Sequence, residues 1–192
     1  MNEKVKQNSI NFGFVLGVIL LLPTILGYAI DTIFIVSYWT GGMQFLVTIT
    51  LGVICVIYSK SLLSGFISFK EAFSSYFTML VVGISISTVF NFFLFNVMDA
   101  DFEKKVMDAF LQVMQSQKEW MLEKANNPTQ EEINTIESNF KIMTESYIVS
   151  KPYAFIPLLK SWLVQVAFYA FFGLIASRIL KKEPPYQLSN EA

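Results

Sequence analysis

The chain of 192 residues is 54% hydrophobic and only 15% charged, whereas typical soluble domains contain roughly 25% charged residues. Its formal net charge of -1 provides no overall basic field for nucleic-acid binding, and the absence of histidine removes the commonest general base and metal ligand. The single cysteine, Cys55, excludes an intrachain disulfide framework and a cysteine-rich metal site. We therefore expect no nucleic-acid partner, no metal and no cofactor.

Four stretches without charged residues have the length of about 20 residues that one helical crossing of a bilayer requires. These stretches cover residues 10–30, 32–59, 72–98 and 161–177. Gly41 and Gly42 indicate a turn inside the second stretch, which leaves 42–58 as its spanning part. The first stretch is longer than the roughly 7–15 apolar residues of a signal peptide, so we expect it to be retained as a helix.

Lysine and arginine near the ends of these stretches predict the topology. With four crossings, one side of the membrane receives the basic residues of the amino terminus, of the second connection and of the tail, which are Lys4, Lys6, Lys60, Lys70, Arg178, Lys181 and Lys182. Such an excess of basic residues is typical of cytoplasmic segments. Both termini are therefore expected in the cytoplasm, and the long segment 99–151 on the opposite side.

Residues 99–151 predict a helical hairpin outside the membrane. In the first arm, about residues 101–125, apolar residues recur at helical spacing, namely Phe102, Val106, Phe110 and Val113. After a break at 126–128, Thr129 and Glu132 have the spacing of a capping box that opens the second arm. The apolar residues on one face of that arm are Ile133, Ile136, Phe140, Met143 and Tyr147. Ser68 and Glu71 form a similar box at the start of the third span.

The two apolar stripes of the hairpin can be buried in two ways. They pack on each other or on the membrane surface, or they bind a partner protein. For the second case, Phe110, Trp120 and Phe140 are the candidate partner-binding residues. We expect the Phe110 and Phe140 rings to be buried in the folded protein.

The cores of the spans contain no ionisable residue, but small and uncharged polar residues form stripes along them. The candidates for intramembrane polar contacts are Gln44, Asn91, Gln165 and Tyr169. Hydrogen bonding that holds the helices together is one interpretation of these stripes, and the lining of a substrate path is the other. We expect Asn91 and Gln165 to face inward. No phosphate-binding loop or nucleophile motif occurs, so we predict no enzymatic activity and no catalytic residue.

The run Ser-Phe-Lys-Glu-Ala-Phe at residues 68–73, preceded by Gly65 and heading a long apolar helix, resembles a family of uncharacterised bacterial membrane proteins. This is domain-of-unknown-function family 4199. The glycine-bearing first span after basic residues, Asp99 at the end of the third span and the basic end of the fourth span are similar as well. The resemblance covers almost the whole chain. It implies four spans in a bacterial cytoplasmic membrane, and it implies no activity.

We therefore predict an all-α integral membrane four-helix bundle. The first three spans occupy residues 1–98, the extracytoplasmic hairpin 99–151, and the fourth span with a disordered cytoplasmic tail 152–192. The predicted role is that of a non-catalytic accessory or assembly subunit, which contacts the lipid bilayer and a membrane-protein partner or a second copy of itself. A small oligomeric transporter or channel is the alternative.

Overall fold

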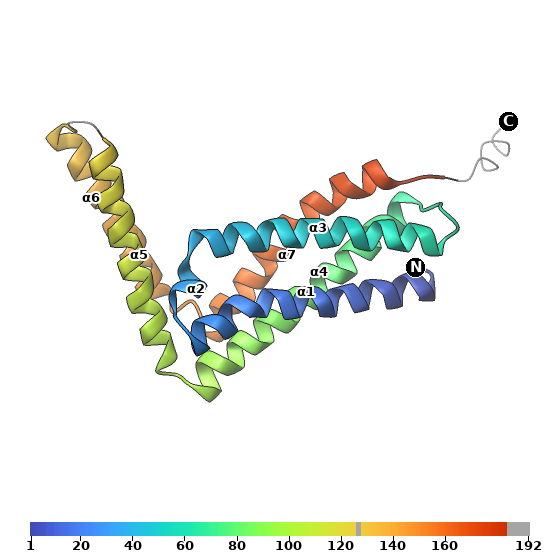
Figure 1. Cartoon of the computed structure of the whole chain (residues 1–192), viewed down its shortest axis with the longest axis horizontal. Helices are drawn as coiled ribbons and strands as arrows, with labels where there is room; N and C mark the ends of the chain where they lie inside the picture. Colours follow the sequence, from blue (N-terminus) through green and yellow to red (C-terminus); the bar gives the residue numbers. More distant parts are fainter. Residues whose placement is uncertain (126–127, 184–192) are drawn as a thin grey trace. The chain divides into compact units, whose positions relative to one another are not determined.

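A computed structural model describes residues 1–125 and 128–183 of the chain (Figure 1). The helices in chain order are α1 (Glu3–Ala29), α2 (Ile33–Val36), α3 (Tyr38–Leu62), α4 (Phe69–Phe93), the π-helical turn η1 (Leu94–Met98), α5 (Phe102–Lys124), α6 (Gln130–Ser150) and α7 (Phe155–Leu180). The predicted break at 126–128 falls partly outside the described residues, and the predicted disorder at 184–192 falls entirely outside them.

Among the described residues, four helices are long and apolar enough to cross a membrane. They are α1, α3, α4 together with η1, and α7. The all-α architecture with four spans and a helical hairpin between the third and fourth is therefore confirmed. Three of the spanning helices, namely α1, α4 with η1, and α7, are longer than their uncharged stretches, because a helix continues into its charged flanks until a capping or turn residue ends it. The exception is α3, since the first residues of the stretch 32–59 form α2 and the turn at Ser37.

The turn predicted at Gly41 and Gly42 is wrong, since both glycines lie inside α3. The chain instead turns at Ser37, whose backbone is extended and which follows the short helix α2. Glycine inside a helix costs roughly 0.5–1 kcal/mol relative to alanine. A backbone that enters lipid must satisfy its hydrogen bonds internally, and this requirement outweighs the local preference of two glycines for a turn.

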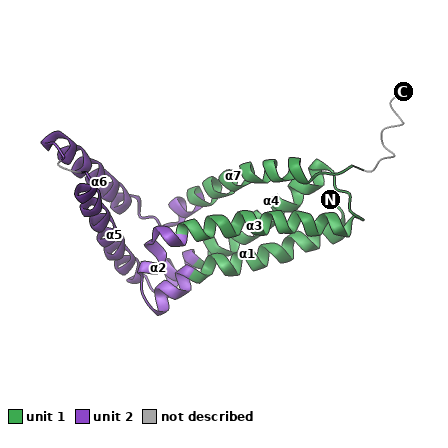
Figure 2. Ribbon diagram, turned by 45° about the horizontal axis from the view of Figure 1, so that its top comes forward, with its two compact units in different colours: residues 1–22, 41–90, 160–192 green, residues 23–40, 91–159 purple. Residues whose placement is uncertain are grey.

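The chain forms two compact units, each described by itself (Figure 2). Unit 1 consists of residues 1–22, 41–90 and 160–192 and contains most of each span. Unit 2 consists of residues 23–40 and 91–159. It combines the hairpin of α5 and α6 with α2, η1 and the adjoining ends of the spans.

The core of unit 1 depends on glycines that allow the helices to approach closely. The Tyr76 ring of α4 is fully buried between Gly52 of α3 and Gly173 of α7. A Cβ atom would lie 2.1 Å from this ring at Gly52 and 2.4 Å from it at Gly173. Between α1 and α4, a Cβ atom at Gly13 would lie 2.6 Å from Cβ of Val82. Small residues at such contacts are the usual means of packing helices in lipid.

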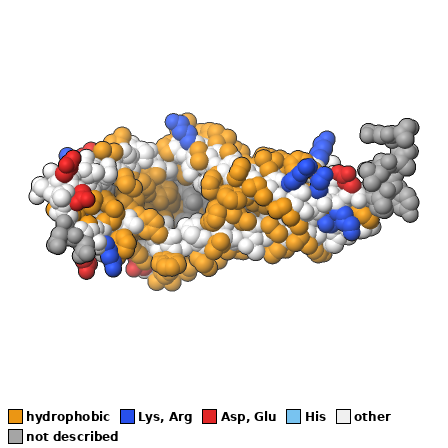
Figure 3. Space-filling view, turned by 90° about the horizontal axis from the view of Figure 1, so that it is seen from above, with side chains coloured by type: hydrophobic (Ala, Val, Ile, Leu, Met, Phe, Trp, Pro, Cys, Tyr) orange, Lys and Arg blue, Asp and Glu red, His pale blue; other side chains and the backbone are white. Residues whose placement is uncertain are grey.

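The outer surface of the spans is apolar. Figure 3 shows a broad hydrophobic surface over them, with basic side chains gathered toward one end. The ends of unit 1 are also tied together there, since Ile67 and Lys182 exchange two backbone hydrogen bonds of 2.9 Å. The Lys60 ammonium donates a hydrogen bond of 2.9 Å to the Leu180 carbonyl at the end of α7. The exposed apolar surface suits a bilayer.

Candidate functional site

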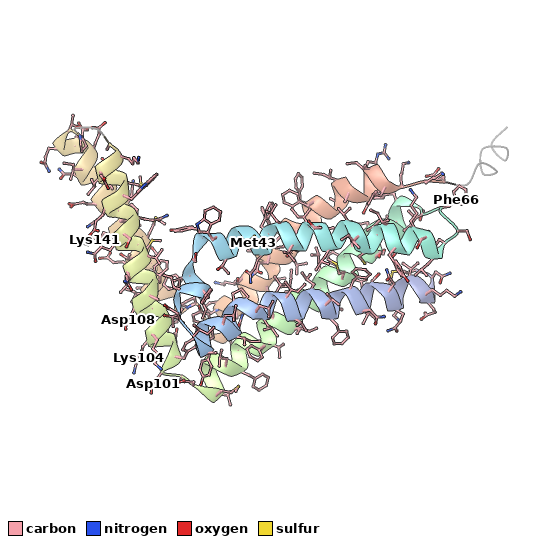
Figure 4. All side chains as sticks on the ribbon, in the orientation of Figure 1. Met43, Phe66, Asp101, Lys104, Asp108 and Lys141 are labelled. Atoms are coloured by element: carbon pink, nitrogen blue, oxygen red, sulfur yellow. The ribbon has the colours of Figure 1, made fainter. Side chains whose placement is uncertain are left out.

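The hairpin begins each of its arms with a local polar contact. At the start of α5, the Lys104 ammonium lies 2.9 Å from the Asp101 carboxylate (Figure 4), and this contact lowers the pKa of Asp101. At the start of α6, the Glu132 amide donates to the Thr129 hydroxyl at 3.3 Å, and the Glu132 carboxylate accepts from the Thr129 amide at 2.8 Å. The Thr129 amide lowers the pKa of Glu132. The predicted capping box is therefore confirmed.

The contact between α5 and α6 is aromatic at one point and open at another. The Phe110 and Tyr147 rings stack with centroids 3.9 Å apart. Farther along, Phe140 lines an open groove of about 310 Å³ together with Leu111 and Met114. Phe110 and Phe140 are half-buried rather than fully buried. The structure thus places both rings between the two helices of the hairpin.

An aromatic cluster lies at the base of the hairpin. The Phe102 ring at the start of α5 lies 4.9 Å from Tyr28 of α1 and 5.3 Å from Phe95 of η1. Phe95 also stacks on Tyr153, which precedes α7, with ring centroids 3.6 Å apart. Asn96 donates a hydrogen bond of 2.8 Å to the Tyr153 carbonyl, and burial raises the pKa of the Tyr153 hydroxyl. These rings fix the start of α5 against the outer ends of two spans.

A second point of attachment lies in the second half of α5. The Tyr38 hydroxyl, at the first residue of α3, donates a hydrogen bond to the side-chain carbonyl of Gln117. The short helix α2 also packs against α5. Beyond this point Trp120, the third candidate partner-binding residue, is 59% exposed.

The outer face of α6 carries apolar residues that its own chain does not cover. No residue of α6 is fully buried. Ile142 is 59% exposed and Val149 is 81% exposed. Val149 follows Ile142 by seven positions, which is about two helical turns, so both side chains lie on one face, opposite the stripe that contains Phe140 and Tyr147.

Two of the four intramembrane candidates make contacts between spans. The Gln44 amide of α3 donates a hydrogen bond of 3.1 Å to the Leu20 carbonyl of α1. Tyr169 of α7 is half-buried, and its ring centroid lies 6.1 Å from that of Phe45 in α3. Asn91 is half-buried in unit 2, and its Oδ1 atom is buried with no hydrogen-bond partner among the described residues.

The expectation that Gln165 faces inward is wrong. Gln165 is exposed, and its amide donates a hydrogen bond of 2.9 Å to Ser161 of the same helix. The buried residues of α7 are Val166, Gly173 and Ser177. Because a helix rotates by about 100° per residue, Gln165 points well away from the direction of Val166. Of the predicted stripe on α7, Gly173 and Ser177 are therefore buried, whereas Gln165 is not.

A polar cluster that the stripes did not indicate joins three spans of unit 1. The Ser75 hydroxyl of α4 lies 2.9 Å from the Ser9 hydroxyl of α1 and 2.7 Å from the Ser59 hydroxyl of α3. The Cys55 sulfur lies 3.4 Å from the Ser75 oxygen, and the Asn8 amide donates a hydrogen bond of 2.9 Å to Ser59. All five side chains are buried. We call this group the serine cluster.

The serine cluster can hold helices together by neutral hydrogen bonds. The one signal for it in the sequence is the four-residue step from Cys55 to Ser59, which places both on one face of α3. Its other members come from helices that the sequence alone does not bring together. Among the described residues, no group of three or more histidine, cysteine, aspartate or glutamate side chains could hold a metal ion.

Comparison with known proteins identifies a matching family. No curated protein and no solved structure matches the chain. Residues 11–182 match the family described as protein of unknown function, domain-of-unknown-function family 4199. The match spans nearly the whole chain, including all or most of every span and the complete hairpin. This membrane-type helical chain therefore belongs to domain-of-unknown-function family 4199.

Proposed function

We propose that this protein is a non-catalytic accessory or assembly subunit of a bacterial cytoplasmic membrane, and that it binds a membrane-protein partner through the outer face of α6. One observation carries this proposal. A helix of 21 residues outside the spans has no fully buried residue and exposes Ile142 and Val149. Apolar side chains that a chain leaves uncovered outside the bilayer are typical of interaction surfaces.

The surroundings of these two residues support a partner surface of protein rather than lipid. Lys141 and Glu145, which flank Ile142 in the sequence, lie 3.9 Å apart as an exposed ion pair beside it. An apolar centre with a charged, solvated rim is the usual composition of a protein interface. A non-catalytic role is supported by the absence of histidine from the sequence.

The proposal places the hairpin on the outer side of the membrane and both termini in the cytoplasm, because basic residues cluster at the ends of the spans opposite the hairpin, whereas the lysines of 99–151 are outnumbered there by acidic residues. Cysteines introduced at Ser116 and at Ser189, after replacement of Cys55, test this topology with an impermeant thiol reagent on intact cells. Ser116 is exposed on α5, whereas Ser189 lies outside the described residues. We expect labelling at Ser116 alone, and equal labelling at both sites would contradict the topology.

The partner surface is tested by purification in mild detergent followed by mass spectrometry. We compare the wild-type protein with Ile142→Asp and Val149→Asp, and with Asn134→Asp as a control at another exposed position of α6. A partner that copurifies in stoichiometric amount with the wild type and the control, and is lost from both test variants, supports the proposal. A partner that is retained by the two test variants contradicts it, and so does purification of the wild type as a lone homo-oligomer.

A small oligomeric transporter or channel is the second candidate, and specific atoms favour it. In unit 1 the buried Tyr76 hydroxyl and Ser177 hydroxyl have no hydrogen-bond partner among the described residues, and in unit 2 the same holds for Asn91 Oδ1. Unpaired polar atoms in a span are costly unless water or a substrate reaches them. Ion conductance of the purified protein in planar bilayers, abolished by Asn91→Leu in a folded variant, would establish this candidate in place of the first.

A further inference from the structure

The face of α5 that contacts the ends of the spans continues past the last contact. Steps of three and four residues place seven residues on this face, which we call the α5 stripe: Phe102, Val106, Ala109, Val113, Gln117, Trp120 and Lys124. The first three are buried. Gln117 accepts the hydrogen bond from Tyr38, and Trp120 is 59% exposed. The stripe thus changes from covered to uncovered within one turn of the helix.

The stripe contacts the ends of two helices that are long and apolar enough to cross a membrane, and the ends of such helices lie near the membrane boundary. Phe102 contacts Tyr28, which is next to the last residue of α1, and Gln117 contacts the first residue of α3. Trp120 follows Gln117 by three residues, which is about 4.5 Å along the helix axis. Trp120 therefore lies about one helical turn of α5 from the residue that contacts the start of α3.

The second helix of the hairpin does not cover this part of the stripe. The groove residues of α5 that face α6 include Leu111, Met114 and Lys118. Successive residues are rotated by about 100° around the helix axis, so the side chains of these groove residues point, on average, well over a quarter turn away from Trp120. Trp120 is therefore directed to the side on which the first half of the stripe meets the span ends.

We propose that the last two turns of α5 rest on the interfacial zone of the lipid bilayer, with Trp120 inserted among the headgroups and Lys124 directed to lipid phosphates. Tryptophan prefers this zone because its ring is apolar and its indole N–H finds a polar partner there. A lysine at the same face is attracted by anionic headgroups. The occupant follows from continuity, because lipid surrounds the spans whose ends cover the first half of the stripe. This inference is independent of the partner surface on α6.

Tryptophan fluorescence in vesicles tests the proposal, because the chain has only three tryptophans. The variant W39F/W162F, with Trp120 alone, is reconstituted in phosphatidylcholine vesicles containing a minor share of phosphatidylglycerol. Quenching by phosphatidylcholine brominated near the headgroup is compared with quenching by aqueous acrylamide. The matched control carries E119W and W120F in the same background, which moves the indole by one residue and about 100° around the helix.

We expect brominated lipid to quench Trp120 strongly and acrylamide to quench it weakly, with the reverse for the control. Quenching of Trp120 by acrylamide alone would show that it faces water, and would overturn the proposal. Protection from both quenchers would show that protein covers it, which would overturn the lipid occupant in favour of a second copy or a partner. Because Trp162 donates a hydrogen bond of 3.0 Å to Ser85, helicity of the variant is checked by circular dichroism. If helicity is lost, Trp162 is retained and quenching is measured in W39F and in W39F/W120F. The difference in quenching between these two variants is the contribution of Trp120.

Discussion

In unit 1 the closest approaches between helices occur at glycines, and small hydroxyl groups join three of the helices, whereas in the hairpin of unit 2 a stacked pair of aromatic rings joins the two helices. The Tyr76 ring packs against Gly52 and Gly173, and the Ser75 hydroxyl shares hydrogen bonds with hydroxyl groups of two other helices. Between α5 and α6 the closest ring contact joins Phe110 and Tyr147. Both regions consist of long helices, so the difference lies in what surrounds them.

Each region uses the interaction that its surroundings make favourable. In lipid an apolar side chain gains little by leaving the acyl chains, so close backbone approach and neutral hydrogen bonds are what distinguish a packed bundle. In water the removal of apolar surface is the main favourable contribution, and large rings supply most of it. The comparison predicts that substitutions of one kind have large effects in one region and small effects in the other.

The largest effect is expected from Gly52→Val. The Tyr76 ring is fully buried against Gly52, so the added side chain cannot be accommodated by a shift of the ring into solvent. Overpacking of this kind typically destabilises by 1–3 kcal/mol, and we expect about 3 kcal/mol in the free energy of unfolding. Thermal unfolding in detergent measures the effect. Gly41→Val is the control, since a Cβ atom there meets nothing within 4 Å. An equal decrease in the free energy of unfolding in both variants would contradict the close packing of Tyr76 against Gly52.

The aromatic contact of the hairpin is tested by Phe110→Ala. Complete burial of a phenylalanine makes this change cost roughly 3–5 kcal/mol, and because Phe110 is half-buried we expect about 2 kcal/mol. The observable is faster proteolysis of the hairpin in membrane vesicles, with the spans still protected. Ile142→Ala, on the uncovered face of α6, is expected to change the stability by less than about 0.5 kcal/mol. If the two variants are cut equally fast, the α5–α6 contact is not what holds the hairpin.

Ser75→Ala removes the hydroxyl shared by the serine cluster. Interhelical hydrogen bonds in membranes contribute about 0.6–1.7 kcal/mol, so we expect the free energy of unfolding to fall by about 1 kcal/mol. Thermal unfolding in detergent again gives the value. Ser61→Ala is the control, because the Ser61 hydroxyl bonds only to the Tyr58 carbonyl of its own helix and is exposed. A larger loss for Ser61→Ala than for Ser75→Ala would refute the role of the cluster.

The smallest effect is a local pH dependence at the start of α6. The Thr129 amide lowers the pKa of Glu132 below its ordinary value of 4.5, so the capping box adds stability above that pH. This contribution disappears as the pH falls through the lowered pKa of the folded state. We therefore expect hydrogen exchange at the first turn of α6 to become faster, relative to the remainder of the helix, as the pH falls from 4.5 through the lowered pKa of Glu132. Thr129→Ala is expected to remove this dependence, and its persistence in that variant would assign it to another group.

The sequence was sufficient for the features that depend on local pattern. The four spans follow from uncharged length, and the hairpin follows from apolar spacing together with the capping box of Thr129 and Glu132. The turn at Gly41 and Gly42 was predicted wrongly because the local preference of glycine says nothing of the lipid that enforces a continuous helix.

The site residues within the spans were harder to predict, because they depend on which helices meet. The four-residue steps of small and polar residues on α7 contain both Gln165 and Gly173, yet only the Gly173 end of this stripe packs against another helix. The serine cluster forms only where Ser9 of α1 and Ser59 of α3 both meet Ser75 of α4. No spacing along a single helix predicts that these three helices meet there. The four-residue step from Cys55 to Ser59 indicates only that these two residues lie on one face of α3.

The two backbone hydrogen bonds between Ile67 and Lys182 bear on how the chain is made. Ile67 lies in the connection before the third span, and Lys182 follows the fourth, so more than half of the chain is synthesised between them. Translation proceeds from the amino terminus, so the first three spans are synthesised before α7 is available to pack against them. Until α7 arrives, the backbone of Ile67 and one face of the Tyr76 ring have no partner. We therefore expect a chain that ends before the fourth span to leave this backbone and this face of the ring uncovered.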